Sequence, residues 1–505
     1  MKANKLLYGL AMTPALACGQ SEKPNIIFVL CDDMGWGDLG CYGQQYISTP
    51  NIDRMAREGM QFMQAYCGSP VSAPSRASLM TGQHSGHCKI RGNKEYWRDQ
   101  WQNNMYGSNG DYKRVGQEPL DPNHVVLPEI MKDNGYTTAQ FGKWAGGYEG
   151  SVSTPDKRGI DEFYGPICQF QAHAYYPNFL NTYSRSKGDA GVSREVLTEN
   201  IKYNFQNDDY FKRPQYSADL IHQRALQWID DVADGDKPFY GLFTYTLPHA
   251  ELAQPEDSIY LSYKAKFCDD KTWGGDVGSW YHRVTNTHAQ FAGMITRLDA
   301  YVGEIMAKLK EKGIDENTIL IFSSDNGPHE EGGADPTFFN RDGVLKGIKR
   351  SCNEGGIRIP FIVRWPGKVP AGVKNDHQLA FYDVMPTFCE LIGITDYVSK
   401  YKRPQSNGKE DYFDGISFLP TLLGNDAQQQ KHDYLYWELS PQIGVRQGNW
   451  KLIVRNGVSE LYDLASDVHE DTNLASQYPE KLAELKAIVR EAHVDNSMFP
   501  ITLPK

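Results

Sequence analysis

The stretch Asn25-Ile26-Ile27-Phe28-Val29-Leu30, followed by Cys31-Asp32-Asp33, gives the clearest indication of fold class in this 505-residue chain. The run is apolar and of strand length, without the alternation of a half-exposed strand, so it predicts a strand covered on both faces of a parallel sheet. Two carboxylates follow it directly. Because open α/β sheets bind ligands beyond the carboxyl ends of their strands, the stretch also predicts a functional site at this end.

Two further apolar runs repeat this pattern. Residues 239–245 end near Pro248-His249, and residues 318–324 end in Asp325-Asn326-Gly327 after a helical stretch over 298–309. Three apolar strands that each end in polar, reactive residues indicate an open α/β sheet with a single site at one edge.

The sequence pattern changes from about Asp383. Short strand-like runs separated by turn residues predict a small antiparallel sheet, and a final helix follows. The runs are 434–437, 443–446, 451–454 and 461–464, and the helix covers 479–493. We therefore expect a catalytic domain over 21–382 and a smaller C-terminal α+β subdomain over 383–505. Two stretches of weak periodicity, 96–123 and 258–285, are predicted as long loops near the site.

Composition and charge exclude several classes of protein. Hydrophobic residues make up 40% and charged residues 23% of the chain, as in ordinary globular proteins. The net charge of -11 gives no electrostatic basis for binding nucleic acid, so positive charge for an anionic substrate must be local. The nine cysteines form no CxxC pair, which argues against a zinc site or a dense disulfide scaffold.

The first 20 residues predict export. Lys2 and Lys5 precede an apolar run over 6–17 and small residues around Cys18, as in a signal peptide, and the run is too short for a membrane span. Ala15-Leu16-Ala17-Cys18 also suits a lipoprotein cleavage site with a lipid anchor on Cys18. Secretion to the periplasm and an outer-membrane lipoprotein of a Gram-negative bacterium both stay open. No other stretch is long and apolar enough to span a membrane.

The run from Ser72 to Gly82, Ser-Ala-Pro-Ser-Arg-Ala-Ser-Leu-Met-Thr-Gly, is the most specific in the chain. It resembles the signature of formylglycine-dependent sulfatases, in which Cys or Ser at the first position is oxidised to an aldehyde. Ser72 could also cap a helix beginning near Pro74, but that interpretation leaves Arg76 unexplained. The resemblance implies a hydrated formylglycine at Ser72, whose second hydroxyl lets sulfate leave without attack of water on sulfur.

Four residues after the apolar strands form a hard, all-oxygen ligand set: Asp32, Asp33, Asp325 and Asn326. Such a set suits calcium or magnesium, and three buried carboxylates without a cation would repel one another. The resemblance favours Ca²⁺. It also implies a group of residues around the sulfate: Arg76, Lys143, His249 and Lys349. We expect Asp325 to serve as base and His249 or Lys349 as the acid for the leaving oxygen, with His249 preferred for its near-neutral pKa.

One departure from the family stands beside Lys143. The family segment is Gly-Lys-Trp-His-Leu-Gly, whereas this chain has Ala145 in the histidine position of Gly142-Lys143-Trp144-Ala145-Gly146-Gly147. That histidine normally contacts a hydroxyl of the diol. The group that assists sulfate elimination in this chain therefore stays open.

The resemblance covers nearly the whole mature chain and implies an alkaline-phosphatase-like α/β core, a mostly parallel sheet flanked by helices, with a C-terminal antiparallel sheet. The segments around Arg91, His173 and Asn326 look like those of bacterial sulfatases acting on sulfated galactose or N-acetylgalactosamine units. His173 and His329 are the candidates for sugar-hydroxyl contacts. Expected partners are a sulfated carbohydrate and a maturase that generates formylglycine; for a Ser-type site this maturase resembles the radical enzymes of anaerobic bacteria.

Two other functions stay open. A phosphatase or phosphonate hydrolase could use the same fold, a metal and a Ser nucleophile, although a two-metal phosphatase would need further His and Asp ligands. An inactive glycan-binding homologue, in which Ser72 is never oxidised, would be consistent with Ala145.

Overall fold

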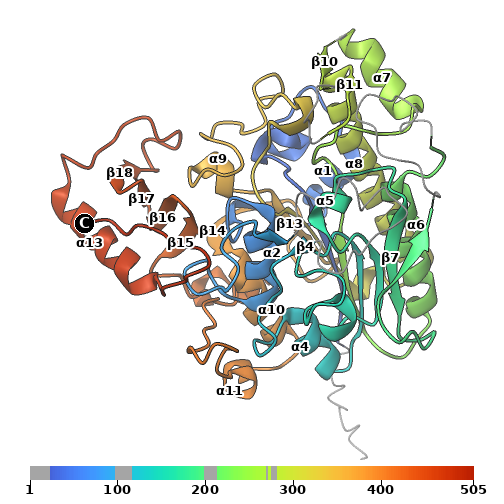
Figure 1. Cartoon of the computed structure of the whole chain (residues 1–505), viewed down its shortest axis with the longest axis horizontal. Coiled ribbons are helices and arrows are strands. Elements are labelled where there is room, and N and C mark those ends of the chain that lie inside the picture. Colours follow the sequence, from blue (N-terminus) through green and yellow to red (C-terminus); the bar gives the residue numbers. More distant parts are fainter. Residues whose placement is uncertain (1–22, 97–115, 198–212, 269–270, 275–280) are drawn as a thin grey trace, which may run out of the picture.

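A ten-stranded sheet forms the centre of the protein (Figure 1). The computed structural model describes residues 23–96, 116–197, 213–268, 271–274 and 281–505. The signal peptide expected over residues 1–20 and the anchor site at Cys18 lie outside these residues. The strand order is β14-β2-β13-β12-β1-β9-β5-β6-β7-β8. Its strands are β1 Asn25–Cys31, β2 Met60–Tyr66, β5 Thr137–Gly142, β6 Glu162–Gly165, β7 Phe179–Ser184, β8 Ser193–Val196, β9 Phe239–Thr244, β12 Thr318–Ser324, β13 Phe361–Arg364 and β14 Val373–Ala380.

The three strands predicted from the apolar runs are β1, β9 and β12, and they are neighbours at the centre of the sheet. β1 pairs in parallel with β12 on one side and with β9 on the other. Cys31 lies opposite Ser324, so the residues that follow β1 and β12 emerge side by side. The prediction of an open α/β sheet with its reactive residues at one edge is therefore confirmed for these strands.

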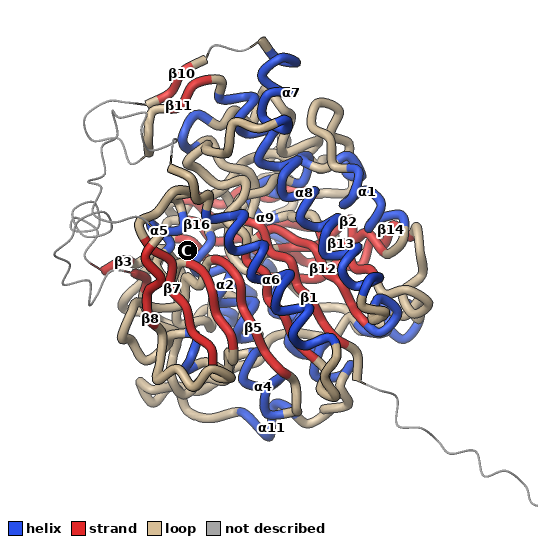
Figure 2. Tube along the Cα trace, turned by 90° about the vertical axis from the view of Figure 1, so that its right-hand side faces the viewer, coloured by secondary structure: helices blue, strands red, loops and turns tan. Residues whose placement is uncertain are grey.

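Helices cover both faces of the sheet, which explains why β1 has no polar face. Ile26, Phe28 and Leu30 pack in the core beneath α2, α4 and α10. Ile27 and Val29 pack on the opposite face with α1, α6 and α8, which cross in front of the sheet in Figure 2. The helices are α1 Pro50–Arg57, α2 Ser72–Thr81, α4 Leu127–Asp133, α5 Gln169–Ala172, α6 Ser217–Ala233, α7 Ser258–Phe267, α8 Thr287–Glu311, α9 Glu354–Ile357, α10 Val384–Leu391, α11 Tyr397–Tyr401, α12 Leu419–Leu422 and α13 Pro479–Ala492.

The small C-terminal sheet is antiparallel throughout, as predicted. Its strands are β15 Leu435–Leu439, β16 Gln442–Gln447, β17 Trp450–Arg455 and β18 Val458–Asp463. One face packs against α13, and the other carries Trp437 and Ile453 into the core of the large sheet. The sheet therefore packs directly on the catalytic core. The boundary at residues 382 and 383 stays a prediction.

One loop prediction was wrong in part. Within 258–285, residues Ser258–Phe267 form the helix α7, and two short strands pair beyond it, β10 Thr272–Trp273 with β11 Val284–Thr285. The Asp257 carboxylate caps α7 by accepting from the backbone N–H groups of Ile259 and Tyr260. The sequence pattern missed α7 because its apolar residues do not gather on one face. Within the other stretch, β3 Glu95–Tyr96 pairs with β4 Gly116–Gln117, and residues 97–115 lie outside the described part.

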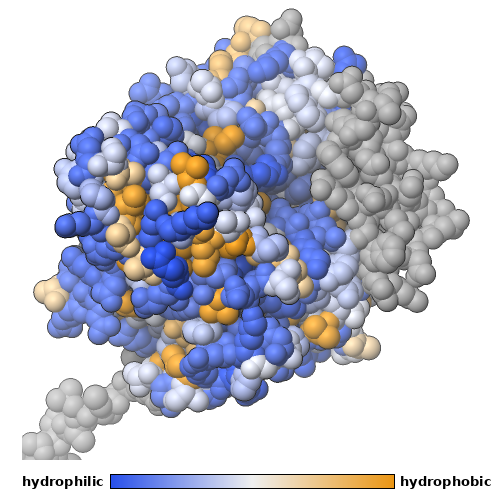
Figure 3. Space-filling model, turned by 60° about the vertical axis from the view of Figure 1, so that its left-hand side comes forward, coloured by the Kyte–Doolittle hydropathy of each residue, from blue (hydrophilic) through white to orange (hydrophobic). Residues whose placement is uncertain are grey.

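The described cysteines are free thiols, and six of them are buried as small apolar residues. No helix within the described ranges is long and apolar enough to cross a membrane. The surface on the side of the C-terminal sheet is mostly hydrophilic, with smaller hydrophobic groups between (Figure 3).

Trp437 should contribute strongly to the stability of the C-terminal sheet on the core. Its ring is fully buried beside Tyr66, and its indole N–H donates to the Cys67 carbonyl at 2.8 Å. We expect Trp437→Ala to lower the free energy of unfolding by about 3–5 kcal/mol, measured by urea denaturation. Val458→Ala, at a 65% exposed position of the same sheet, should change it by less than about 0.5 kcal/mol. A small loss at Trp437 would show that this packing contributes little.

Candidate active site

Ser72 is the first residue of α2 and lies at the edge of the sheet where β1 and β12 end. Its hydroxyl donates to Asp32 Oδ1 at 2.8 Å and lies 3.3 Å from Asn326 Oδ1. The N-cap position of α2 is Val71, and the Ser72 side chain makes no capping bond. The capping interpretation therefore does not describe this hydroxyl, which faces polar oxygens of the sheet edge.

The four predicted metal ligands come together here. Asp32 and Asp33 follow β1, Asp325 and Asn326 follow β12, and all four are fully buried. The Asp325 N–H donates to the Cys31 carbonyl at 3.1 Å, so the parallel pairing continues past the strand ends. The Asp33 N–H donates to Asp325 Oδ1 at 3.1 Å, and Asn326 Nδ2 donates to Asp33 Oδ1 at 2.6 Å.

Each of the three carboxylates pairs with one basic side chain. Lys143 Nζ donates to Asp32 Oδ2 at 2.6 Å, and Lys349 Nζ donates to Asp33 Oδ2 at 2.8 Å. Arg76 Nε donates to Asp325 Oδ2 at 2.8 Å. Three buried carboxylates and three buried cations therefore balance one another around Ser72, as a low-dielectric interior requires.

The three carboxyl groups differ in pKa. Burial alone would raise the pKa of Asp32 and of Asp33, but Lys143 holds the first well below its usual value and Lys349 lowers the second. Burial together with the neighbouring Asp32 raises the pKa of Asp325 to about 7. Asp325 is thus the carboxyl of the cluster that most readily exchanges a proton near neutral pH.

A divalent cation fits this group of oxygens. Carboxylate and amide oxygens are the ligands of hard cations such as Ca²⁺ and Mg²⁺, and the four donors lie within one hydrogen-bonded cluster. Because the basic side chains already balance the carboxylates, a bound cation would leave the site positively charged. That charge suits an anionic substrate.

His249 lies beyond the end of β9, between the cations and the pocket. Its Nδ1 hydrogen-bonds the Ala250 carbonyl and so carries a proton. Its Nε2 lies 3.0 Å from Lys349 Nζ and 3.2 Å from Asp33 Oδ2. Burial and the Lys349 ammonium lower the pKa of His249, so its neutral ring accepts a hydrogen bond from Lys349.

A pocket of about 400 Å³ opens onto Ser72. Its lining residues are Ser72, Asn93, Glu95, Lys143, Gln169, Phe170, His173, His249, Tyr281, Glu331, Lys349 and Arg350. The His173 ring stacks on His249 with 3.9 Å between centroids, so this predicted sugar contact does lie at the pocket wall.

His329 lies elsewhere. It stacks near the other side of His249, with 5.3 Å between centroids, and is fully buried. Its Nε2 lies 3.1 Å from the Pro248 carbonyl, and its Nδ1 accepts from the Glu331 N–H at 3.1 Å. The pocket lining does not include it. His329 therefore holds two loops together, and its predicted contact with a sugar hydroxyl has no support in this position.

Glu331 and Arg350 belong to the pocket wall but carried no signal in the sequence. Glu331 Oε1 lies 2.5 Å from Arg350 Nη2 and 3.3 Å from Lys349 Nζ. The Tyr281 hydroxyl donates to Glu331 Oε2 at 2.9 Å. These contacts form only where loops distant in sequence meet. The one available hint was that Glu331 follows Asp325 by six positions in the same loop.

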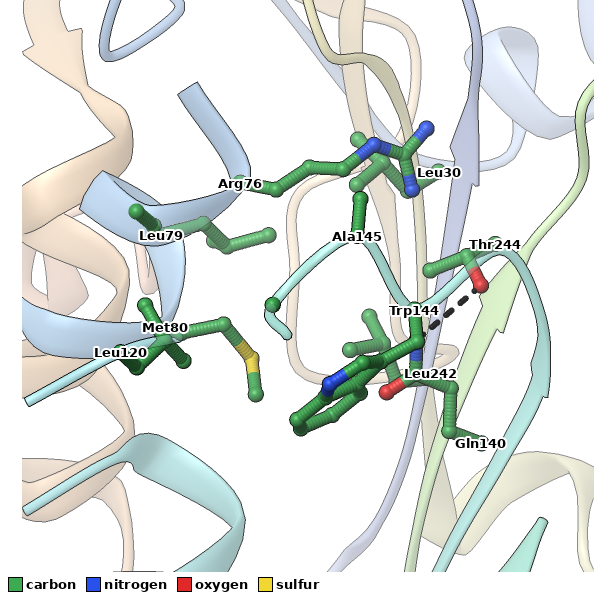
Figure 4. A pocket seen from close by; sticks show the side chains of 12 residues that line it. Leu30, Arg76, Leu79, Met80, Leu120, Gln140, Trp144, Ala145, Leu242 and Thr244 are labelled. Carbon is green, nitrogen blue, oxygen red and sulfur yellow. Dashed lines mark hydrogen bonds between the residues drawn. The ribbon is translucent and has the colours of Figure 1, made fainter. Parts of the chain in front are cut away.

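Ala145 stands beside Arg76 at a small cavity (Figure 4). Its backbone is left-handed, with φ of 57°, and the cavity has room for a water molecule, with about 20 Å³ open to the water's centre. Arg76 Nη2 has no hydrogen-bond partner among the described residues and lies 3.8 Å from Asp32 Oδ2. No histidine is among the lining residues, so no imidazole from elsewhere in the described chain fills the position.

A second group of metal-type side chains is His84, His87 and Asp414. His87 Nδ1 lies 2.8 Å from Asp414 Oδ1, and His84 Nε2 lies 3.8 Å from the same oxygen. His84 Nδ1 accepts from the Gly86 N–H at 3.1 Å, so Nε2 carries the proton of the neutral ring. This arrangement suits hydrogen bonding to Asp414 better than metal binding.

Comparison with known proteins agrees with this geometry. The family model for sulfatases matches residues 24–394, and the model "N-sulphoglucosamine sulphohydrolase, C-terminal" matches residues 348–495. An N-acetylgalactosamine-6-O-sulfatase of Bacteroides thetaiotaomicron is 30% identical, with 93% of each chain covered. An N-acetylgalactosamine-6-sulfatase of Canis lupus familiaris is 31% identical over 88% of this chain and 74% of its own.

Among solved structures, Ps i-CgsB in complex with k-i-k-neocarrahexaose has a TM-score of 0.69 at 24% identity, with 96% of each chain covered, and shows the same fold. The family match extends over the large sheet and includes Ser72, the four predicted oxygen ligands and the three basic side chains. The chain therefore belongs to the sulfatase family.

Proposed function

We propose that this sulfatase removes sulfate from sulfated galactose or N-acetylgalactosamine units of glycans, using a formylglycine made from Ser72 and a bound Ca²⁺. The observation that carries the proposal is the position of the Ser72 hydroxyl, which lies among three carboxylate–cation pairs and faces a pocket of about 400 Å³. The relatives named N-acetylgalactosamine-6-sulfatase support the sugar class.

Formylglycine at position 72 would supply a geminal diol, one hydroxyl of which attacks sulfur while the other later expels sulfate. The chain's own residues prepare this position. Asp32 accepts from the side-chain hydroxyl at 2.8 Å and so orients it. The N-terminus of the ten-residue helix α2 favours negative charge at its first residue, which suits an attacking oxygen.

Asp32, Asp33, Asp325 and Asn326 would hold the Ca²⁺, which supplies a Lewis acid beside the attacking hydroxyl. The cation also changes what the basic side chains can do. Lys143, Lys349 and Arg76 balance the carboxylates by themselves, and with a cation present their charge becomes available to the sulfate oxygens.

We assign the proton donor for the leaving sugar oxygen to His249. It lies at the pocket wall, and its Nε2 shares a hydrogen-bonded proton with the Lys349 ammonium 3.0 Å away, so the pair holds a proton beside the pocket. Asp325, which pairs with Arg76 beside Ser72, is the candidate to take the proton of the second hydroxyl when sulfate leaves. The proton donated to the sugar oxygen leaves with the alcohol product, and the proton taken up by Asp325 replaces it in the cluster.

Ala145 favours one second function, an inactive glycan-binding homologue. The cavity beside Arg76 contains no imidazole, so a step that needs one there could not proceed. The Lys349–His249 pair and Asp325 provide proton-transfer groups without it, and for this reason we prefer the active enzyme.

We further propose that the protein is exported, either to the periplasm or as an outer-membrane lipoprotein anchored at Cys18. The basic residues and apolar run of the first 20 residues support export. A Ser-type site would be matured by an oxygen-independent radical enzyme, as in anaerobic bacteria.

Oxidation of Ser72 is the direct test of the mechanism. In protein produced together with a maturase that accepts Ser, we expect the peptide containing Ser72 to lack two hydrogens by mass spectrometry. Ser72→Ala should lower kcat/KM by at least about a thousandfold, because both hydroxyls are lost. An active preparation with fully unmodified Ser72 would exclude the mechanism.

Calcium binding can be tested without an activity assay. We expect about one Ca²⁺ per chain and a rise in Tm of about 2 °C or more with saturating Ca²⁺, since a ligand that binds only the folded state stabilises it. Asp33→Asn should abolish both effects, and a chelator should reverse them in the unaltered protein. Asp414→Asn, in the group with His84 and His87, serves as the control and should retain both. Loss of calcium in Asp414→Asn alone would place the ion in that second group.

The leaving-group role of His249 can be separated from binding. His249→Ala should lower kcat/KM for a sulfated sugar at least about a hundredfold more than for a nitrophenyl sulfate, because a nitrophenolate leaves without a proton. Equal losses on the two substrates would assign His249 to sulfate binding. The same assays on Lys349→Ala would then show whether Lys349 is the acid.

A further inference from the structure

The loop over residues 346–353, here called the Lys349 loop, carries Lys349 into the site and Arg350 into the pocket wall. The Lys349 N–H donates to the Pro328 carbonyl at 2.8 Å, and the Gly355 N–H donates to the Lys346 carbonyl at 2.8 Å. The Gly327 N–H donates to the Gly356 carbonyl at 3.1 Å. The two ends of the Lys349 loop are therefore joined to each other, and the loop that carries Asn326 contacts it at Lys349 and just beyond its end at Gly356.

The C-terminal sheet holds the Lys349 loop from outside. Gln442 of β16 donates through Nε2 to the Arg350 carbonyl at 2.8 Å and accepts from the Cys352 N–H at 3.2 Å. Glu470, which follows β18, accepts from Asn353 Nδ2 at 3.0 Å and from the Glu354 N–H at 2.8 Å. In Figure 1 the short helix α9, which begins at Glu354, lies on the side of the core that faces this sheet.

Lys451 of β17 lies behind this contact. Its Nζ is 2.7 Å from Glu354 Oε1 and 3.1 Å from Glu470 Oε1, and all three side chains are fully buried. The Tyr66 hydroxyl donates to Glu354 Oε2 at 2.6 Å. Burial opposes ionisation of Glu354, but Lys451 and Arg446 lower its pKa to about 2, so the carboxylate stays charged.

A buried ion cluster of this kind is poorly explained by stability. Removing charges from water costs free energy that their mutual attraction often fails to return, and apolar side chains of the same volume often stabilise a fold as well or better. The cluster does fix the geometry of this region, because its carboxylate oxygens accept hydrogen bonds from donors in defined directions. The part of the chain fixed in this way is the turn at Asn353 and Glu354 that ends the Lys349 loop.

We propose that Glu470 and Lys451 are positioning residues, which fix the turn at Asn353 and Glu354 and thereby hold Lys349 in place to bind sulfate. The inference rests on the proposed role of Lys349 in binding the sulfate group. It gives the C-terminal sheet a part in the reaction although the pocket lining contains none of its residues. Groups that bind a reacting anion need support of this precision, since small displacements reduce activity strongly.

The test compares Glu470→Ala with Glu470→Gln. The alanine variant loses both acceptor contacts, so we expect the inhibition constant of inorganic sulfate and the KM for nitrophenyl sulfate to rise at least about tenfold. The glutamine variant keeps an oxygen that can accept from both N–H groups but turns its amide NH2 toward the Lys451 ammonium, so its values should rise less than those of the alanine variant. Neither constant depends on how much of the preparation is active, so partial unfolding cannot imitate the effect.

Arg364→Met provides a matched control. Arg364 is another buried cation that pairs with two carboxylates, Glu58 and Asp315, but it lies toward the opposite end of β12, across from Leu320. We expect it to lower Tm while both constants stay unchanged. If Glu470→Ala likewise lowers Tm and leaves both constants unchanged, the positioning role is wrong. If the alanine variant does not fold, Lys451→Met, which removes only the charged amine, takes its place. A rise in both constants would support the positioning role, and unchanged constants would overturn it.

Lys349→Met separates this inference from the proposed function. If it raises the sulfate inhibition constant and Glu470→Ala does not, Lys349 binds sulfate and only the positioning role is wrong. If Lys349→Met leaves the constant unchanged, the assignment of Lys349 itself is wrong and the positioning role is overturned with it. Increases in both variants, with Arg364→Met unchanged, support the inference.

Discussion

The parallel pairing of β1 with β12 is the constraint on which the site depends. With Cys31 opposite Ser324, the chain must place Asp32 and Asp33 next to Asp325 and Asn326 as both strands leave the sheet. Three carboxylates this close are unfavourable unless cations neutralise them. The positions of Lys143, Arg76 and Lys349 follow from that requirement as much as from any contact with substrate.

Each of the three basic side chains that neutralise the carboxylates comes from a different part of the chain. Lys143 follows β5, Arg76 lies one turn into α2, and Lys349 arrives on a loop after β12. The backbone joins the first of these to the sheet edge directly, since the Lys143 N–H donates to the Thr244 carbonyl of β9 at 2.9 Å. Lys349 lacks a strand of its own next to the site. Its loop is instead held by the loop around Pro328 and by the C-terminal sheet.

The sequence predicted those parts of the fold in which burial leaves a simple pattern. A strand covered on both faces must be apolar throughout, and the central strands could be read from that property alone. The Ser72 run and the residues that end the strands identified the oxygen cluster in the same way. The sequence did not predict helix α7, because its apolar residues are spread around the helix and its stability depends on the Asp257 cap and on packing.

The remaining parts of the site could not be read because their partners are distant in sequence. Lys451 lies in a strand between apolar residues, where a lysine is usually taken as solvent-facing, yet its amine is fully buried against Glu354 and Glu470. Glu331 likewise becomes part of the pocket only through Arg350 and Tyr281, which arrive on other loops. His329 lies beside the predicted ligands Asp325 and Asn326 in the sequence, but its ring joins two loops.

The sheet edge and the loops contribute different groups to the site. Most of the groups proposed to act on the sulfate lie in α2 or directly after a strand, as Ser72, Arg76 and Lys143 do, and the buried core fixes these elements in place, whereas Lys349 arrives on a loop. The wall of the pocket around them comes mostly from loops, with Asn93, Tyr281 and Arg350 on three separate loops and Phe170 on the short helix α5. Loop residues can change without disturbing the central pairing. Under the proposed function, sulfate chemistry and sugar preference therefore depend largely on different parts of the fold.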